Sequence, residues 1–144
     1  MNDPGSPDAQ LATRLRLAVG RLHRRIRLAT NDIPPLQLSS LVSIEMHGPL
    51  RLGELAQREA VTAPTMTRVL AALDERGFIV RTPDPDDARS TRVSMSPAGS
   101  AALASVRNQR TALLDARLAR LSEADRAALA AALPALEALI TAGE

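Results

Sequence analysis

The stretch DPDDARSTRV, residues 84–93, places three carboxylates beside two arginines. Residues of these types can hold a metal ion, form an acidic surface loop, or make the tip of a β-hairpin whose arginines reach an anionic partner. A calcium-binding loop also requires a glycine at its sharp turn and a distal glutamate, and this stretch has neither. We therefore expect no metal here, and the choice between the other two depends on the flanking elements.

Other groupings that could support catalysis or metal binding are missing from the sequence. His23 and His47 are far apart and lack the spacing of metal ligands. The chain has no cysteine, which excludes disulfides, cysteine-ligated zinc and thiol switches. It shows neither a serine, histidine and aspartate order typical of nucleophilic catalysis nor a glycine-rich phosphate loop. We expect a protein that is not an enzyme and that uses no metal or cofactor.

A second cluster, residues 62–68, could read DNA from the start of a helix. Thr62 is a good N-cap, and Pro64 falls in the first turn, where its missing N–H costs nothing. The apolar positions expected to face the core are Met66, Val69, Leu70 and Leu73. The candidate DNA contacts are Thr62, Pro64, Thr65, Thr67 and Arg68. Short polar groups with one long bidentate donor suit the major groove, although an ordinary amphipathic helix would fit this segment equally well.

Composition narrows the class of partner. The chain has 144 residues, enough for one compact domain or two small modules, and 45% of them are hydrophobic. Phe78 is the only aromatic residue, which argues against stacking on single-stranded nucleic acid. All 18 basic residues are arginine and the net charge is +2. Six arginines lie in residues 14–27, where we favour a solvated face or pairing with a second subunit over contact with phosphate.

Apolar periodicity and helix caps predict the elements that position these clusters. We expect helices over about 9–29, 36–46 and 52–60, then from Thr62 to Arg76, from Pro97 onward and after Ser122, the last one kinked at Pro134. In the second helix, Leu38, Leu41, Val42 and Met46 are expected to face inward. The segments 78–82 and 91–95 alternate like strands around a Pro/Asp loop and predict a hairpin. Residues 1–8 are expected to form a disordered tail.

This order of elements is typical of a winged helix-turn-helix. The expected fold class is mainly α with a small β-hairpin, in which a winged helix-turn-helix core is flanked by N- and C-terminal dimerisation helices. The expected boundaries are 9–34 for the N-terminal dimerisation helix, 35–96 for the DNA-binding lobe and 97–144 for the C-terminal dimerisation helices.

With this order of elements, the sequence resembles the MarR family of transcription regulators over about residues 9–142. The resemblance lies in LGELAQREAVTAPTMTRVLAALDERGFIVR, residues 52–81, and DPDDARSTRVSMSPAG, residues 84–99. The family usually has a basic residue or glycine where Ala88 stands, and often Leu-Thr where Met95-Ser96 stand. These departures are mild and concern the wing.

The resemblance implies that DPDDARSTRV is the wing of the fold. It implies that Arg89 enters the minor groove while Asp87 braces the loop, and Arg92 is a further candidate contact. A narrow minor groove attracts a guanidinium by its negative potential. We expect Asp84 and Asp86 to form the turn. A flexible acidic surface loop remains the alternative.

The function implied is sequence-specific binding to double-stranded DNA as a homodimer on a pseudo-palindromic site. In this family the outcome is most often repression, released by a small anionic or aromatic ligand, for which we assign no residues. A constitutive architectural DNA binder and a winged-helix protein-interaction module are the alternatives. The longest apolar run, residues 127–136, is too short for a bilayer, so we expect a cytoplasmic protein without membrane contact.

Overall fold

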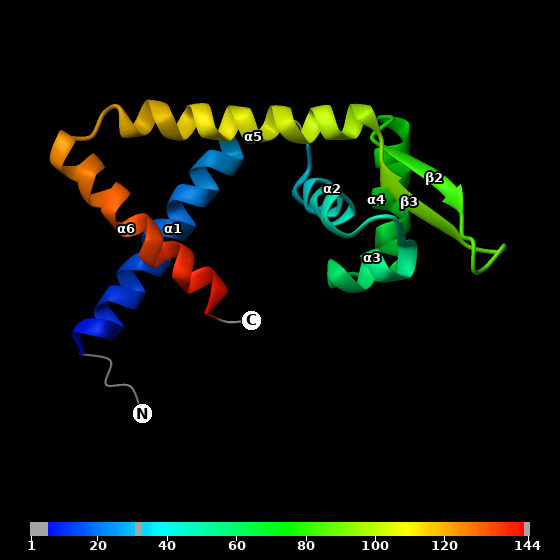
Figure 1. Ribbon diagram of the computed structural model, residues 1–144, viewed down its shortest axis with the longest axis horizontal. Helices are drawn as coiled ribbons and strands as arrows, with labels where there is room; N and C mark the ends of the chain where they lie inside the picture. The colour runs from blue at the N-terminus through cyan, green and yellow to red at the C-terminus, as the bar shows by residue number, and fades with distance from the viewer. Residues whose placement is uncertain (1–5, 31–32, 143–144) are drawn as a thin grey trace.

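The computed structural model describes residues 6–30 and 33–142 (Figure 1). The helices are α1 (Pro7–Ala29), α2 (Pro35–His47), α3 (Leu52–Arg58), α4 (Ala63–Glu75), α5 (Pro97–Leu118) and α6 (Glu123–Thr141). The strands are β1 (Leu50–Arg51), β2 (Ile79–Pro83) and β3 (Thr91–Met95). Mainly helical structure with a small antiparallel sheet confirms the predicted fold class.

Two regions lie at opposite ends of the long helix α5 (Figure 1). One is the winged lobe, made of α2, α3, α4 and the sheet. The other contains α1 and α6, which overlap in this view below the far half of α5 and whose residues, such as Val19 and Leu139, line a common cavity. Within the described residues, no helix combines the length and apolar character needed to cross a lipid bilayer.

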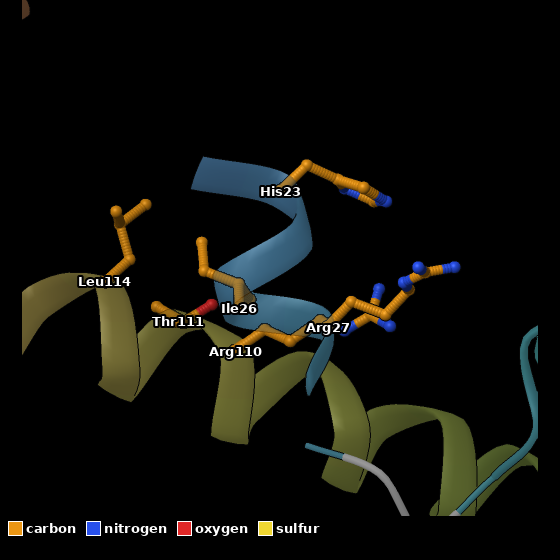
Figure 2. A pocket seen from close by; sticks show the side chains of 6 residues that line it. All are labelled: His23, Ile26, Arg27, Arg110, Thr111 and Leu114. Atoms are coloured by element: carbon orange, nitrogen blue, oxygen red, sulfur yellow. The ribbon is translucent and has the colours of Figure 1, made fainter. Parts of the chain in front are cut away.

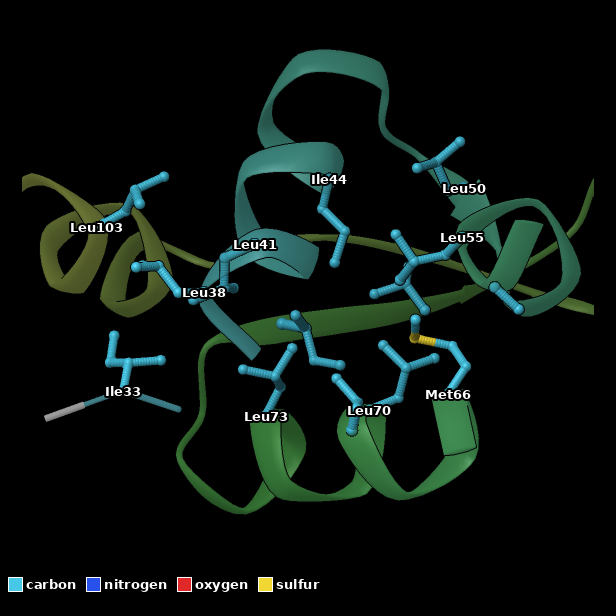
Figure 3. Close-up of a cluster of buried hydrophobic side chains, with 14 of the residues drawn as sticks. Ile33, Leu38, Leu41, Ile44, Leu50, Leu55, Met66, Leu70, Leu73 and Leu103 are labelled. Atoms are coloured by element: carbon cyan, nitrogen blue, oxygen red, sulfur yellow. The ribbon is translucent and has the colours of Figure 1, made fainter. Parts of the chain in front are cut away.

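The hydrophobic core belongs to the winged lobe and the start of α5 (Figure 3). Leu41, Leu55, Leu70 and Leu73 have no exposed surface, and burying each side chain of this kind contributes roughly 1.5–3 kcal/mol. All four apolar positions predicted for α4, namely Met66, Val69, Leu70 and Leu73, are buried. The core therefore fixes which face of α4 is left for solvent or a ligand.

One predicted core position on α2 was wrong. Met46 is 69% exposed, and Ile44 is buried in its place. Ile44 follows fully buried Leu41 by three residues and shares its face, whereas Met46 points about 140° away at about 100° per residue. A methionine in the last turn matched the apolar pattern without lying on the buried stripe.

Hydroxyl caps begin three helices where the sequence predicts them. Thr62, Ser96 and Ser122 each accept a hydrogen bond from the backbone N–H three residues later. Ser6 caps α1 in the same way, so α1 begins at Pro7 and not after residue 8. The predicted tail, residues 1–8, was therefore too long at its end, and its first five residues lie outside the described part of the chain.

The sheet contains a strand that the sequence did not reveal. The predicted hairpin is present as β2 and β3, with Ile79 opposite Met95 and Pro83 opposite Thr91. On the other side of β3, the two-residue strand β1 pairs antiparallel with it, so the strand order is β1-β3-β2. A two-residue strand is too short to show alternation. Because β1 runs directly into α3, this strand joins the wing to the pair of helices α3 and α4.

Candidate nucleic-acid interface

The leading end of α4 is held by its own threonines. The Thr62 hydroxyl accepts from Thr65 N–H at 3.4 Å and lies 3.0 Å from the Thr65 hydroxyl. The Thr67 hydroxyl donates to the Ala63 carbonyl at 2.9 Å. The hydroxyl hydrogen of Thr67 is thus used inside the helix, leaving an acceptor oxygen and a methyl group for a partner. Thr65 is half-buried, whereas Thr62, Pro64 and Thr67 are exposed.

Arg68 is the long donor of this face. Its side chain is exposed and forms no hydrogen bond or ion pair with any described residue. The guanidinium projects from the face opposite buried Met66 and Leu70. It is therefore available for a bidentate bond to a base edge or a phosphate.

A tight turn sets the angle between α3 and α4. Ala60 adopts the left-handed conformation, with φ of 53°, and Val61 N–H donates to the Ala56 carbonyl at 3.0 Å. Ala56 itself is buried, as expected of a small residue where two helices cross closely. At the end of α3, the Glu59 carboxylate accepts bonds from Ser39 and Ser43 of α2. The turn is thereby fixed to a third helix.

The loop of the wing is closed by Asp84, which has two roles. Its N–H donates to the Ser90 carbonyl at 3.0 Å, and its carboxylate accepts from Asp86 N–H at 3.0 Å, as expected of a turn former. The same carboxylate is fully buried and paired with Arg51 and Arg92. The bond from Arg51, followed by that from Asp86 N–H, holds the pKa of Asp84 well below its usual range. The ion pairs were not predicted.

Arg92 lies at the base of the wing. Its guanidinium is 3.2 Å from the Asp84 carboxylate and 3.0 Å from that of Asp86, and its side chain is 28% exposed. Contact of Arg92 with DNA remains a prediction, and it would compete with these two carboxylates. The same pairs show that Asp84 and Asp86 are occupied by arginines. Among the described residues no group of three or more metal-ligating side chains occurs.

At the tip of the wing, Asp87 and Arg89 are both exposed. The Asp87 carboxylate accepts from the Arg89 backbone N–H at 3.0 Å, and its carbonyl accepts from Ser90 N–H at 2.9 Å. Asp87 thus braces the backbone of the loop, not the arginine side chain. The Arg89 guanidinium has no hydrogen-bond or ion-pair partner in the described part of the chain.

Ser96 joins the wing to the end of α4 and the start of α5. Its hydroxyl donates to the Gly77 carbonyl at 2.5 Å and accepts from Gly99 N–H at 3.0 Å, while its own N–H donates to the Phe78 carbonyl at 3.0 Å. A Cβ at Gly99 would lie 2.1 Å from that Phe78 carbonyl oxygen. The Ser-Pro-Ala-Gly pattern therefore encodes a close backbone crossing as well as a helix start.

A groove of two neighbouring cavities lies among α1, α2 and α5. One cavity of about 260 Å³ is lined by His23, Ile26, Arg27, Arg110, Thr111 and Leu114. Arg27 and Arg110 extend toward the same side from α1 and α5 (Figure 2). A neighbouring cavity of about 320 Å³ shares both arginines and adds Leu38, Ser39 and Val42 of α2. Two cations beside apolar side chains suit a small anion. The sequence did not predict this site, because its residues come from three helices.

The comparisons with known proteins agree with this geometry. The family model described as MarR family matches residues 33–91. The chain is 40% identical over 135 residues to an uncharacterised HTH-type transcriptional regulator of Mycobacterium bovis, covering 92% of this chain and 94% of that protein. It is 27% identical over 120 residues to the HTH-type transcriptional repressor MdtR of Bacillus subtilis, covering 79% and 77%.

A solved structure extends the agreement to the whole fold. It is the crystal structure of a proposed transcriptional regulator of Pseudomonas aeruginosa, with a TM-score of 0.79 and 37% identity, covering 95% of this chain and 98% of that one. The match includes the terminal helices as well as the winged lobe. The chain therefore belongs to the MarR family of winged helix-turn-helix transcriptional regulators.

Proposed function

We propose that this MarR-family protein binds a pseudo-palindromic double-stranded DNA site as a homodimer and represses transcription until a small anionic ligand releases it. The observation that carries the proposal is the contrast among the arginines of the winged lobe. Arg51, Arg81 and Arg92 are paired with carboxylates, whereas Arg68 on α4 and Arg89 on the wing, like Arg58 on α3, are exposed and unpaired among the described residues. Unpaired arginines on two adjacent projections suit the major and minor grooves of one duplex.

The exposed apolar residues of the terminal helices support a homodimer. Neither α1 nor α6 has a buried residue in the single chain. Large apolar side chains that are at least 40% exposed on these helices are Leu11, Leu17, Val19, Leu22, Leu28, Leu129, Leu133, Leu139 and Ile140. A second copy would cover such a surface. Two-fold symmetry then favours an operator with half-sites about one helical turn apart.

The groove between α1, α2 and α5 supports a role for an anionic ligand. It is lined by α2 of the winged lobe on one side and by α1 and α5 on the other, and α1 is one of the helices that we propose to form the dimer. A ligand that binds Arg27 and Arg110 could therefore change how the two lobes of the dimer are spaced. Repression is favoured because the relative MdtR is a transcriptional repressor. Since chromosomal DNA is the partner, we assign the protein to the cytoplasm.

The test is a titration of the purified protein with a duplex taken from upstream of its own gene and with a scrambled duplex of equal composition. We expect at least about 10³-fold preference for the first and a measurable salt dependence for both. An architectural binder would show steep salt dependence with no preference, and a protein-interaction module would bind neither duplex. Footprinting of the preferred duplex should give two protected half-sites, and a single half-site would contradict the dimer.

A further inference from the structure

The buried carboxylate of Asp84 connects the wing to the helix pair that presents α4. We infer that Asp84 and Arg51 form a latch that holds the wing in a fixed position relative to α4. Both are then positioning residues, which act on DNA through Arg89 without contacting DNA themselves. The inference rests on the proposed contact of Arg89 with the minor groove.

The latch spans all three strands of the sheet. Asp84 follows directly after β2, Arg51 ends β1, and Arg92 lies on β3. The Asp84 carboxylate accepts from Arg51 Nε, and its other oxygen lies 3.2 Å from Arg92 Nη2. One side chain from the wing loop thus bonds to both of the other strands.

Repulsion between the two arginines explains why a carboxylate is required. Arg51 and Arg92 stand directly opposite each other in the antiparallel pairing of β1 with β3. Like charges at such a position destabilise a strand pair. The Asp84 carboxylate lies against both guanidiniums and offsets their repulsion, while the exposed Asp86 carboxylate bonds to Arg92 alone. Without the Asp84 charge, β1 would be pushed away from the wing.

From Arg51 the connection continues into the helices. Arg51 is the N-cap residue of α3, and its N–H donates to the Glu54 carboxylate at 2.7 Å. Helix α3 packs against α4 at buried Leu55 and Ala56. In the other direction, the Asp84 N–H bond to the Ser90 carbonyl closes the loop that carries Arg89. The latch therefore lies on the path between the two projections that would enter the grooves.

Burial separates this role from direct contact with DNA. The Asp84 side chain has no exposed surface, and a carboxylate would repel phosphate. Arg51 is 40% exposed at its side chain but already bonded to Asp84. An effect of either residue on DNA affinity would thus have to be transmitted through the position of the wing.

The first test is a double-mutant cycle on DNA binding. Asp84→Asn should weaken binding of the preferred duplex about tenfold, but by no more than about twofold when Arg89→Ala is already present. Arg51→Gln removes the other partner of the bond between Arg51 and Asp84. Because the Arg51 side chain is partly exposed, this variant tests the latch even if Asp84→Asn fails to fold. Asp86→Asn is the matched control, because it removes one exposed bond to Arg92, and should weaken binding less than about threefold. Equal losses with and without Arg89 would mean that Asp84 is merely structural and would overturn the latch.

The second test measures the position of the wing without DNA. Because the protein has no cysteine, Ala71→Cys on α4 and Ala88→Cys on the wing tip would provide the only thiols for spin labels. Labelled chains are mixed with excess unlabelled chains so that only distances within one chain are read. The distance distribution should broaden with Asp84→Asn and with Arg51→Gln, and stay narrow with Asp86→Asn.

These tests separate failure of the latch from failure of the proposed function. If Arg89→Ala leaves DNA affinity unchanged, the proposed wing contact is wrong, and the spin-label distances still decide whether the latch holds the wing. If Arg89→Ala weakens binding while Asp84→Asn and Arg51→Gln leave affinity and distances unchanged, the latch is wrong and the wing contact stands.

Discussion

Large apolar residues are mostly buried in the winged lobe but mostly exposed on the terminal helices α1 and α6. In the lobe, α2, α3 and α4 direct leucines into a core with no exposed surface at Leu41, Leu55 or Leu70. On α6 no residue is buried, and Ile140 is 77% exposed. The lobe, together with the start of α5, therefore encloses a core within one chain, whereas the leucines of α1 and α6 stay at least partly exposed in the single chain. If a second copy covers the terminal helices, as proposed, stability and assembly depend on different parts of the chain, and substitutions should separate them.

The largest expected effect is on the lobe, from Gly99→Ala. The new Cβ would lie 2.1 Å from the Phe78 carbonyl oxygen and 2.9 Å from the Met95 sulfur, so the wing or α5 must shift. We expect a loss of about 3 kcal/mol or more in the free energy of unfolding, measured by urea denaturation. Gly53→Ala on α3 is the control, because nothing lies within 4 Å of its added Cβ. That change should leave stability equal or raise it by up to about 1 kcal/mol. Similar behaviour of the two variants would contradict the close crossing.

The next largest effect is expected on assembly, from Ile140→Glu on α6. If a second copy covers this apolar surface, as proposed, a charge there should weaken the homodimer by roughly 2 kcal/mol or more, which is about thirtyfold in its dissociation constant. Sedimentation at decreasing protein concentration measures this dissociation constant directly. Met46→Glu is the matched control, because Met46 is also a highly exposed apolar residue but belongs to the winged lobe. If Met46→Glu dissociates the protein and Ile140→Glu does not, the assignment of assembly to the terminal helices is reversed.

How much of this contrast can be read from the sequence depends on the range of the interactions. Caps and breaks are local, so Thr62, Ser96 and Gly77 mark the ends of helices within one turn of the residues they contact. The periodicity of α4 likewise predicts its buried face. Residue Met46 shows the limit of this reasoning, because an apolar type near a helix end need not lie on the buried stripe.

The candidate site was predictable where one segment forms it and not where segments meet. Exposure of Thr62, Pro64, Thr67 and Arg68 follows from the face of a single helix. The bond of Arg51 to Asp84 joins residues 33 positions apart through a strand too short to predict. The groove of Arg27 and Arg110 likewise depends on the crossing of two distant helices. A charged residue beside a turn carries no signal of which distant partner it will meet.

Within the lobe, a smaller effect should separate free arginines from paired ones. Arg68→Ala should cost about 1–3 kcal/mol of DNA-binding free energy and relax preference at one base pair of each half-site. Arg89→Ala should instead alter preference for narrow A·T-rich flanks. Arg81→Ala is the control, because that exposed arginine is 2.5 Å from Asp74 and is expected to change affinity little. The measurement is a binding series over operator variants with melts of each protein. Unchanged affinity in both Arg68→Ala and Arg89→Ala, with normal melts, would contradict their assignment to DNA contact.

The smallest expected effect is a dependence of lobe stability on acid, through Asp84. Arg51, with the Asp86 N–H and Arg92, holds the pKa of this buried carboxyl below its usual range. An unfolded aspartate has its ordinary pKa of about 4, so the folded state binds fewer protons over the interval between the two values. The stabilisation is therefore complete above about pH 4 and is lost as the pH falls toward the folded pKa. Thermal melts of wild type and Asp84→Asn should differ at pH 7 and converge as the pH is lowered below 4, because the variant has no carboxyl to titrate there. A difference in Tm that stays constant down to about pH 2.5 would mean that the charge of Asp84 does not stabilise the lobe, and that its bonds to Arg51 and Arg92 are no stronger than those of a neutral amide.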